Sequence, residues 1–296
     1  MRCRRLSGEA LHPATAAHDA QVLSLTDDEL HLLVVALVPV AASNLSATCK
    51  RLHRVSQAGL ADMRERAIDA LVERVGSSRK AFGLADALFL ENRALQKTDC
   101  ALLGLLAGSG ELSQLRALDI STTEEPPEGT KVALSGRNRR RSSTPNAFGD
   151  EGMVAFTSTL ARGVLPSLEL LYLSDTILGP VGVGALASAL ARGAMPSLSL
   201  LNLNRNVVTD AGLELLLRVS ESLGGLTHLW LQHNCITDAG MLSLATLLAS
   251  GALPALRVCV VGGNPASDMA QAAVAQSLAT RGTRARLLAA AERLSG

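Results

Sequence analysis

Leucines and other aliphatic residues recur at fixed intervals along the second half of the chain. The pattern is L-x-x-L-x-L-x-x-N, and its clearest copy has leucines at 198, 201 and 203 followed by Asn206. Copies begin at residues 168, 198, 226 and 256, which lie 30, 28 and 30 residues apart. A period in this range is typical of a solenoid, in which each unit buries its apolar side chains against its neighbours.

Each unit is predicted to contain one strand and one helix. In the unit that begins at Leu198, Leu201 and Leu203 alternate with a polar residue, which predicts a short strand with both leucines on one face. Thr209 and Asp210 then offer a helix N-cap, and leucines follow at helical spacing. Parallel stacking of such units would bury a leucine core that no single unit could bury alone.

Two further units are predicted nearer the N-terminus, with strands that begin at residues 85 and 115. The interval from 115 to 168 is 53 residues, so we expect one inserted loop. We place it at residues 121–145, where Pro, Gly, Ser and Thr are frequent, and expect it to be disordered. Its run Arg139–Ser143 resembles a basophilic kinase site, and a nuclear-import patch or an insertion without a role are the alternatives.

The pattern divides the chain into five segments. Residues 85–268 carry about six repeats, and the segments on either side are short and mostly helical. We expect a disordered N-terminus at 1–22, small helices at 23–56, connecting helices or an N-terminal cap at 57–84, and a C-terminal helical cap at 269–296.

The period of 28 to 30 residues, with a full helix in each unit, resembles the ribonuclease-inhibitor subclass of leucine-rich-repeat proteins. The resemblance implies an α/β fold: a curved horseshoe solenoid with parallel strands inside and helices outside, and a small all-α segment before it. Such a fold does not by itself set an activity, so function must be sought in the side chains on the strands.

Motif positions two, three, five, seven and eight would point away from the leucine core onto the concave face. Position five holds the only Trp, the only Tyr and one Phe of the chain, and Tyr and Trp are favoured anchors of protein interfaces. We therefore predict a protein partner here, with a solvent-facing Trp230; the alternative is that aromatic residues simply suit strand surfaces. The predicted partner-binding residues are Phe89, Asp119, Glu169, Tyr172, Asp175, Asn202, Arg205, His228, Trp230 and His233.

Residues 25–52 contain two short amphipathic stripes separated by a proline, with Thr26 and Asp27 as a helix N-cap. Their order and spacing resemble an F-box, although the usual Pro after the first Leu is Thr26. The resemblance implies a substrate receptor that docks on the adaptor subunit of a cullin–RING ubiquitin ligase. The implied docking or core residues are Leu25, Leu33, Leu37, Pro39 and Cys49. The alternative is a helical cap over the first repeat.

Composition narrows the partner class. The net charge is +1, so no overall field attracts nucleic acid or an acidic membrane. Five scattered cysteines argue against a disulfide framework and favour a reducing compartment. The longest apolar run is too short to span a bilayer, and the basic N-terminus lacks the apolar core of a secretory signal. We expect a cytoplasmic and/or nuclear protein that binds neither nucleic acid nor membrane.

No motif for catalysis or for a cofactor is present. The chain has no phosphate-binding G-x-x-x-x-G-K-[ST] loop, no G-x-S-x-G and no H-E-x-x-H. His228 and His233 lack the further ligands that zinc requires, so no metal is expected. An enzyme is therefore not predicted. Two alternatives would use the same concave face: an enzyme inhibitor or scaffold, and a GTPase activator, because the repeats are similar to those of the Ran GTPase-activating protein.

Overall fold

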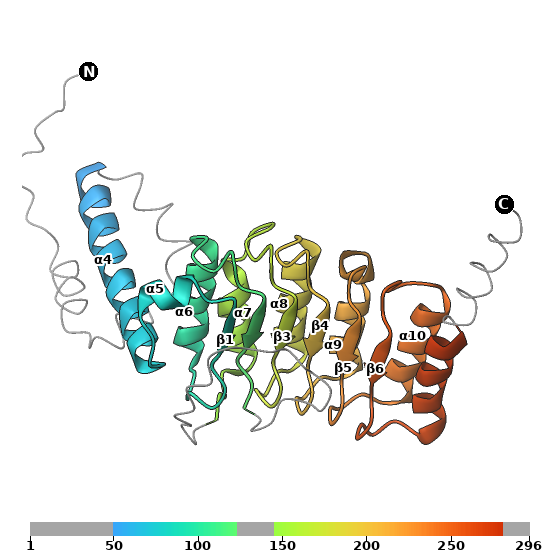
Figure 1. Cartoon of the computed structure of the whole chain (residues 1–296). Helices are drawn as coiled ribbons and strands as arrows, with labels where there is room; N and C mark the ends of the chain where they lie inside the picture. Colours follow the sequence, from blue (N-terminus) through green and yellow to red (C-terminus); the bar gives the residue numbers. More distant parts are fainter. Residues whose placement is uncertain (1–49, 123–144, 281–296) are drawn as a thin grey trace, which may run out of the picture. The chain divides into compact units, whose positions relative to one another are not determined.

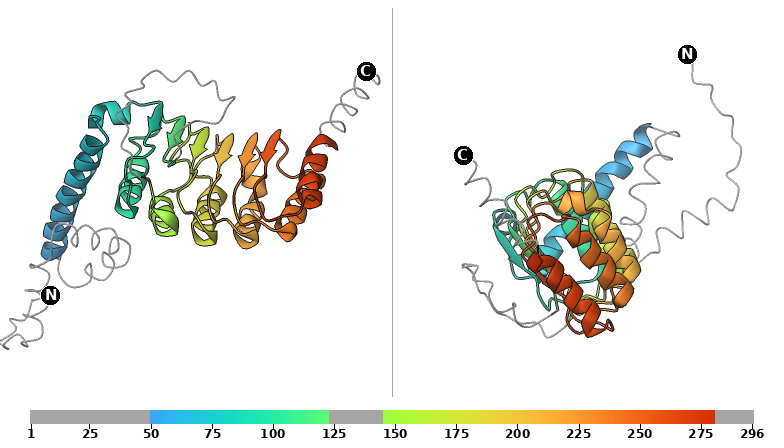
Figure 2. Two further views of the ribbon diagram at one scale, coloured as in Figure 1. Left: turned by 90° about the horizontal axis from the view of Figure 1, so that it is seen from below. Right: turned by 90° about the vertical axis from the view of Figure 1, so that its right-hand side faces the viewer.

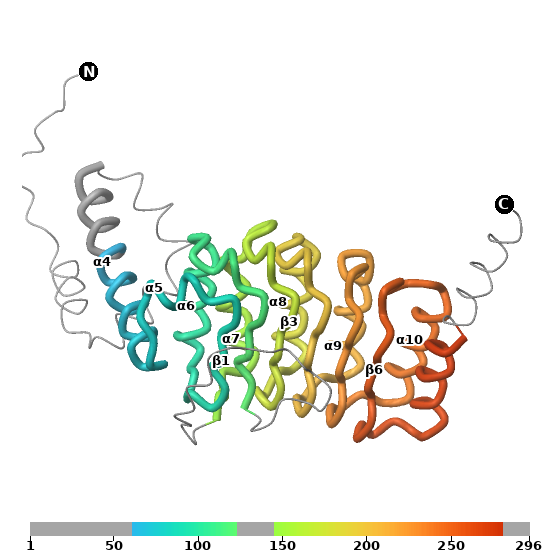
Figure 3. Tube along the Cα trace, viewed as in Figure 1, coloured from blue at the N-terminus to red at the C-terminus, as the bar shows by residue number. Residues whose placement is uncertain are grey.

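The structure is a computed structural model that describes residues 50–122 and 145–280, with side chains described from residue 61 onward (Figure 3). The chain divides into two compact units, residues 1–64 and residues 65–296, and each is considered by itself. Of the first unit, only the beginning of helix α4 (Lys50–Arg74) lies in the described ranges. The second unit contains the whole sheet.

Six short strands form one parallel sheet in chain order (Figure 1). They are β1 (Ala87–Phe89), β2 (Ala117–Asp119), β3 (Leu170–Tyr172), β4 (Leu200–Asn202), β5 (His228–Trp230) and β6 (Val258–Val260). Strand pairing aligns residues at the same motif position in consecutive repeats, so each motif position forms a column across the sheet. The fourth position, for example, forms the column Leu88, Leu118, Leu171, Leu201, Leu229 and Cys259.

Helices lie on one side of this sheet, one after each strand (Figure 2). They are α6 (Lys97–Gly108), α7 (Gly149–Ser158), α8 (Pro180–Ala191), α9 (Asp210–Leu217) with the 3-10 helix η1 (Ser220–Leu223), and α10 (Asp238–Ala249); residues 268–280 are also helical. The aliphatic residues at motif positions four and six pack with the inner sides of these helices in one continuous core. The second unit is therefore a leucine-rich-repeat solenoid of the predicted α/β class.

An asparagine at motif position nine closes the turn after four of the six described strands: Asn146, Asn206, Asn234 and Asn264. The side chain of Asn206 is buried, and its Oδ1 accepts hydrogen bonds from the backbone N–H groups of Thr176 (3.1 Å) and Leu178 (2.9 Å) in the preceding repeat. Its Nδ2 donates to the carbonyls of Leu173 (2.8 Å) and Leu203 (3.1 Å). One amide thus satisfies buried backbone groups of two repeats, which a leucine core could not do.

Asn146 fills this position in the second repeat, at the far end of the insertion. It is fully buried, its Oδ1 accepts from the N–H groups of Arg93 (3.0 Å) and Leu95 (2.9 Å), and its Nδ2 donates to Leu90 O (2.7 Å). Position nine would otherwise fall at residue 123, so 23 residues are inserted, and without them the interval of 53 residues becomes 30. The insertion therefore interrupts the turn of the second repeat.

The insertion starts later than residue 121, where the sequence placed it. Ser121 is buried, and Thr122 continues the strand pairing by donating its N–H to Ser174 O (2.9 Å). The Thr122 hydroxyl accepts from the N–H of Asn146 and donates to its carbonyl, both at 3.1 Å. These two bonds join the ends of the insertion, so the solenoid continues across it without a gap.

The aspartate at the start of a helix serves the next repeat. Asp210 was predicted to cap its own helix, but its Oδ1 accepts from the N–H of Thr237 (2.8 Å) and its Oδ2 from the Thr237 hydroxyl (2.5 Å). Asp150 makes the same kind of bond to Gly179 N (2.6 Å). The close approach requires glycine in the neighbouring helix, because a Cβ at Gly240 would lie 2.3 Å from Oδ1 of Asp210.

The N-terminal edge of the core is covered by the end of α4 and by α5 (Arg79–Gly83). Apolar residues of both helices belong to the same core as the repeats: Ala67, Ile68, Leu71, Val72 and Phe82. This burial is what a capping element must provide, because a solenoid otherwise exposes its terminal apolar face.

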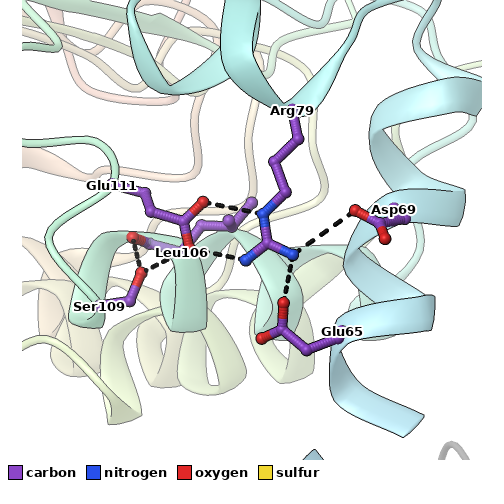
Figure 4. A network of polar contacts seen from close by, with 6 residues as sticks. All are labelled: Glu65, Asp69, Arg79, Leu106, Ser109 and Glu111. Atoms are coloured by element: carbon purple, nitrogen blue, oxygen red, sulfur yellow. Dashed lines mark hydrogen bonds and ion pairs between the residues drawn. The ribbon is translucent and has the colours of Figure 1, made fainter. Parts of the chain in front are cut away.

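Arg79 fastens this cap to the first repeat (Figure 4). Its guanidinium donates to both carboxylate oxygens of Glu111 (3.0 and 2.8 Å), and it also binds Glu65 and, at 3.5 Å, Asp69 of α4. Ser109 donates to Glu111 as well (3.0 Å). The hydrogen bonds that Arg79 donates to Glu111 raise the pKa of Arg79, and they lower the pKa of Glu111. The fork geometry of Arg matches a carboxylate in two bonds, which a lysine could not do.

The F-box-like residues Leu25, Leu33, Leu37, Pro39 and Cys49 lie outside the described residues. Helix α4 runs continuously past residue 56, the boundary that the sequence pattern suggested between this segment and the cap. In the described ranges, no helix has the length and apolar character to cross a bilayer.

Candidate protein-binding face

One face of the sheet is not covered by any helix of the described residues. The strands run along one side of the second unit and the helices along the other, as the left view of Figure 2 shows. We call the sheet face that points away from the helices the open face. It carries motif positions three and five, because successive side chains of a strand point to opposite faces.

Position five forms a single column across this face, as the sequence predicted. The strand register aligns Phe89, Asp119, Tyr172, Asn202, Trp230 and Val260. The lone Trp and the lone Tyr therefore lie two strands apart on the same surface, with one asparagine between them.

The prediction that Trp230 faces solvent is wrong. Its side chain is only 9 % exposed, and Tyr172 is similarly buried. The burial is not in the leucine core: the two rings belong to a separate cluster with Leu200. Strands two apart are roughly 9.6 Å from each other, yet the ring centroids are 6.3 Å apart with an interplanar angle of 54°. The rings therefore lean together over the shorter Asn202, which is only 3 % exposed.

The aromatic rings are part of an apolar patch that extends to motif position three. Leu170 and Val260 are half-buried against the cluster, and Val258 at the edge strand is 37 % exposed. The sequence analysis left out the aliphatic residues at position three. These residues could have been identified from the sequence, because each stands next to a buried leucine at position four and must therefore point to the opposite face of the sheet.

Asp119 lies in the same column and is almost fully buried. Its Oδ1 accepts from the N–H (3.0 Å) and the hydroxyl (2.5 Å) of Ser121. Burial and the neighbouring carboxylate of Glu91 raise the pKa of Asp119 to about 7, although the bonds from Ser121 oppose this shift. A carboxyl group with this pKa is only partly ionised at neutral pH.

Three of the predicted residues are exposed at the rim, where each strand ends. Asp175, Arg205 and His233 occupy motif position eight, and all have positive φ angles of 57°, 54° and 54°. This left-handed backbone turns their side chains outward while the following residue enters the turn. Their row places one negative, one positive and one titratable group side by side on consecutive repeats.

The remaining predicted residues are partly used within the protein. Glu169 accepts two hydrogen bonds from Arg116 (3.1 and 3.0 Å), so its charge is already paired on the neighbouring strand. Nδ1 of His228 lies 2.8 Å from the hydroxyl of Thr227. Phe89 is 36 % exposed on edge strand β1. The structure thus places nine of the ten predicted residues at motif positions three, five and eight, and Glu169 at position two, but it leaves only some of them accessible.

The turns beside the rim carry exposed apolar side chains that the sequence analysis missed. Ile177 is 58 % and Val207 is 44 % exposed, and each lies two residues after a rim residue. The same place in the repeat, directly after motif position nine, holds Ala147, Cys235 and Pro265 in other repeats, and all three are exposed. The signal available in the sequence was an apolar residue directly after the buried Asn or Thr at motif position nine.

In the part of the chain that the structure describes, no group of three or more His, Cys, Asp or Glu is arranged to hold a metal ion. Cys100, Cys235 and Cys259 are free thiols. The open face therefore offers hydrogen-bonding, charged and apolar groups, which are the components of a protein interface.

Comparison with known proteins identifies the repeats. The family described as Leucine Rich repeat matches residues 194–217 and 226–245, which include β4, α9 and β5. No curated protein gives a significant sequence match. Among solved structures, the chain is similar to "Leiomodin-1 Actin-Binding Site 2 (ABS2)", with 15 % identity, a TM-score of 0.44, and coverage of 65 % of this chain and 95 % of that chain. It is also similar to the tropomodulin C-terminal domain of Caenorhabditis elegans, with 17 % identity, a TM-score of 0.36, and coverage of 50 % and 83 %. These similarities carry no inference about what this chain binds.

Proposed function

We propose that this chain is a non-enzymatic protein-binding module and that its partner binds on the open face of the sheet. The observation that carries the proposal is an uncovered sheet face with an apolar patch at its centre and charged side chains at its rim. An interface of this kind excludes water over its apolar centre and gains specificity from the polar rim. We also propose that the protein acts in the cytoplasm and/or the nucleus, in keeping with its unclustered cysteines.

The regular stack supports this role physically. Each repeat presents two strand residues to the face in fixed register, so a partner meets a surface that is already ordered before binding. A preformed surface avoids much of the entropy cost of ordering loops on association. The buried asparagines and the bonds between neighbouring helices keep this register.

The test is affinity capture from a cell extract with the whole chain as bait. A face variant combines Asp175→Arg, Arg205→Glu and Val258→Glu, which alter exposed side chains on the open face and its rim. A control variant combines Arg162→Glu and Val181→Glu, which alter exposed side chains outside the open face and change the net charge by more than the face variant does. Trp230→Ala is less informative, because removal of a packed ring would also disturb Tyr172.

We expect the wild type and the control to capture the same partner and the face variant to lose it, while circular dichroism shows that all three are folded. Equal capture by the face variant would refute the assignment of the open face. The change at three positions should weaken binding at least tenfold, because reversed charges place like charges against the partner's rim.

We further propose that the partner is a substrate of a cullin–RING ubiquitin ligase. The support is the F-box-like order of residues 25–52, ahead of a cap and a leucine-rich-repeat solenoid. In this role the segment with Leu25, Leu33 and Leu37 would bind the ligase adaptor while the open face selects the substrate. Co-purification with the adaptor should be lost in a Leu33→Asp/Leu37→Asp variant; absence of the adaptor from the wild-type sample would sink this second proposal and leave the first intact.

A further inference from the structure

Charge is distributed unevenly along the open face. The strand segments of the first three repeats, residues 86–93, 116–122 and 169–176, contain five carboxylates and two arginines, a formal charge of −3. The corresponding segments of the last three repeats, residues 199–206, 227–234 and 257–264, contain two arginines, two histidines and no carboxylate, a formal charge of +2 with neutral histidines. The strand segments with their flanking residues are therefore acidic in the first half of the stack and basic in the second.

The contacts leave fewer free carboxylates at the acidic end than the formal charge counts. At the acidic end, Glu169 is paired with Arg116, and Asp119 holds a proton part of the time because of its raised pKa. Asp86 and Asp175 remain exposed there. At the basic end, Arg205 and Arg257 are exposed, and no carboxylate lies in the same strand segments to neutralise them.

The apolar patch lies in the middle of the stack and overlaps both halves. The patch consists of three side chains that pack together on adjacent strands: Tyr172 on β3, Leu200 on β4 and Trp230 on β5. Asn202, which lies between the two rings in strand order, is only 3 % exposed and adds little polar surface to the patch. A partner that crosses the strands from Asp86 in the first repeat to Arg257 in the sixth would therefore pass the apolar patch on the way.

We infer that the open face binds a polypeptide segment of another protein with a basic end, an apolar centre and an acidic end, laid across the strands with its basic end over the first three repeats. This inference rests on the proposed function and names the chemistry of the partner. Charge complementarity of this kind fixes orientation and rejects segments of the wrong polarity. The outer strands are about 24 Å apart, a span that an extended segment covers with roughly seven residues.

The test uses three synthetic peptides without tryptophan and the full-length chain. The first has three lysines, a Leu-rich apolar centre and three glutamates; the second has the same composition with lysine and glutamate alternating at both ends; the third has lysines at both ends. Fluorescence anisotropy of labelled peptides gives each affinity. The first peptide should bind about tenfold more tightly than the second, which corresponds to about 1.4 kcal/mol, and the difference should shrink at high salt.

A charge-reversal variant tests the orientation. In Arg205→Glu/Arg257→Glu the basic end becomes acidic, so this variant should prefer the third peptide to the first. The control Arg162→Glu/Arg218→Glu changes two exposed arginines outside the open face by the same charge and should keep the wild-type preference.

Equal affinity for the first and second peptides, or an unchanged preference in the charge-reversal variant, would overturn the inference. Binding that appears only after deletion of residues 123–144 would also overturn it, because that segment of the chain would then be the occupant of the face. Loss of the captured partner in the face variant, together with equal peptide affinities, would refute this inference alone. Capture unaffected by the face variant would refute the proposed function.

Discussion

Replacement of Asn146 by alanine tests whether the insertion interrupts a turn that the solenoid depends on. The substitution removes the acceptor of two N–H groups, the part-buried one of Arg93 and the buried one of Leu95, and the donor to three backbone carbonyls. An unsatisfied buried group costs about 1–3 kcal/mol, so the two N–H groups alone should lower the free energy of unfolding by about 4 kcal/mol. At about 2–4 °C per kcal/mol for a domain of this size, the melting temperature should fall by roughly 10 °C.

Asn204→Ala is the matched control. Its side chain also exchanges hydrogen bonds, with Gln232 (2.8 and 3.3 Å), but it is half-exposed on the open face, so water can replace the lost partner. We expect a loss of only about 1 kcal/mol. Urea denaturation followed both by circular dichroism and by Trp230 fluorescence measures the two changes, because a solenoid can unfold in stages that a single probe would merge. If Asn146→Ala costs no more than Asn204→Ala, the assignment of Asn146 to the ladder of turn asparagines is refuted.

Gly240→Ala should lower the free energy of unfolding by about 2 kcal/mol, as overpacking does, because the added Cβ would lie 2.3 Å from Oδ1 of Asp210. The control is Gly224→Ala, where the added Cβ would make an ordinary contact at 3.7 Å. Thermal denaturation should show a much smaller loss of stability for the control. Asp119→Asn should flatten the pH dependence of stability. The pKa of Asp119 is raised to about 7 by burial and is about 3.9 when unfolded, so the wild type loses stability as pH rises between these values and the variant does not; denaturation midpoints at a series of pH values would show it. Arg79→Gln should cost about 1 kcal/mol and increase hydrogen exchange in residues 65–83 before the repeats, and uniform exchange throughout would contradict its role in holding the cap.

The repeat and its elements were predictable because both follow from local periodicity. Leu201 and Leu203 alternate with a polar residue, as a strand requires. The strand register pairs Asn202 with Trp230, the same two residues that counting along the motif assigns to position five. Asn146 was not predictable in the same way, since 23 inserted residues separate it from its strand. The role of Asp210 was also missed, because its partner Thr237 belongs to the next helix and a single unit contains no sign of it.

The candidate site was predicted by position but not by exposure. Counting along the motif placed Tyr172 and Trp230 on the same sheet face, which the structure shows. Their burial depends on the packing of two rings from β3 and β5 on either side of Asn202. This packing involves three repeats, so the sequence of a single repeat does not predict it. The exposed Ile177 and Val207 were overlooked because apolar residues in a repeat are first assigned to the core.

The open face contains the only tryptophan of the chain, so its fluorescence reports on that surface directly. Titration of the full-length protein with the tryptophan-free peptide that has a basic end, an apolar centre and an acidic end should change the Trp230 emission in a saturable way, at the same concentrations at which anisotropy shows binding. Binding by anisotropy with an unaltered emission spectrum would place the partner elsewhere and contradict the account.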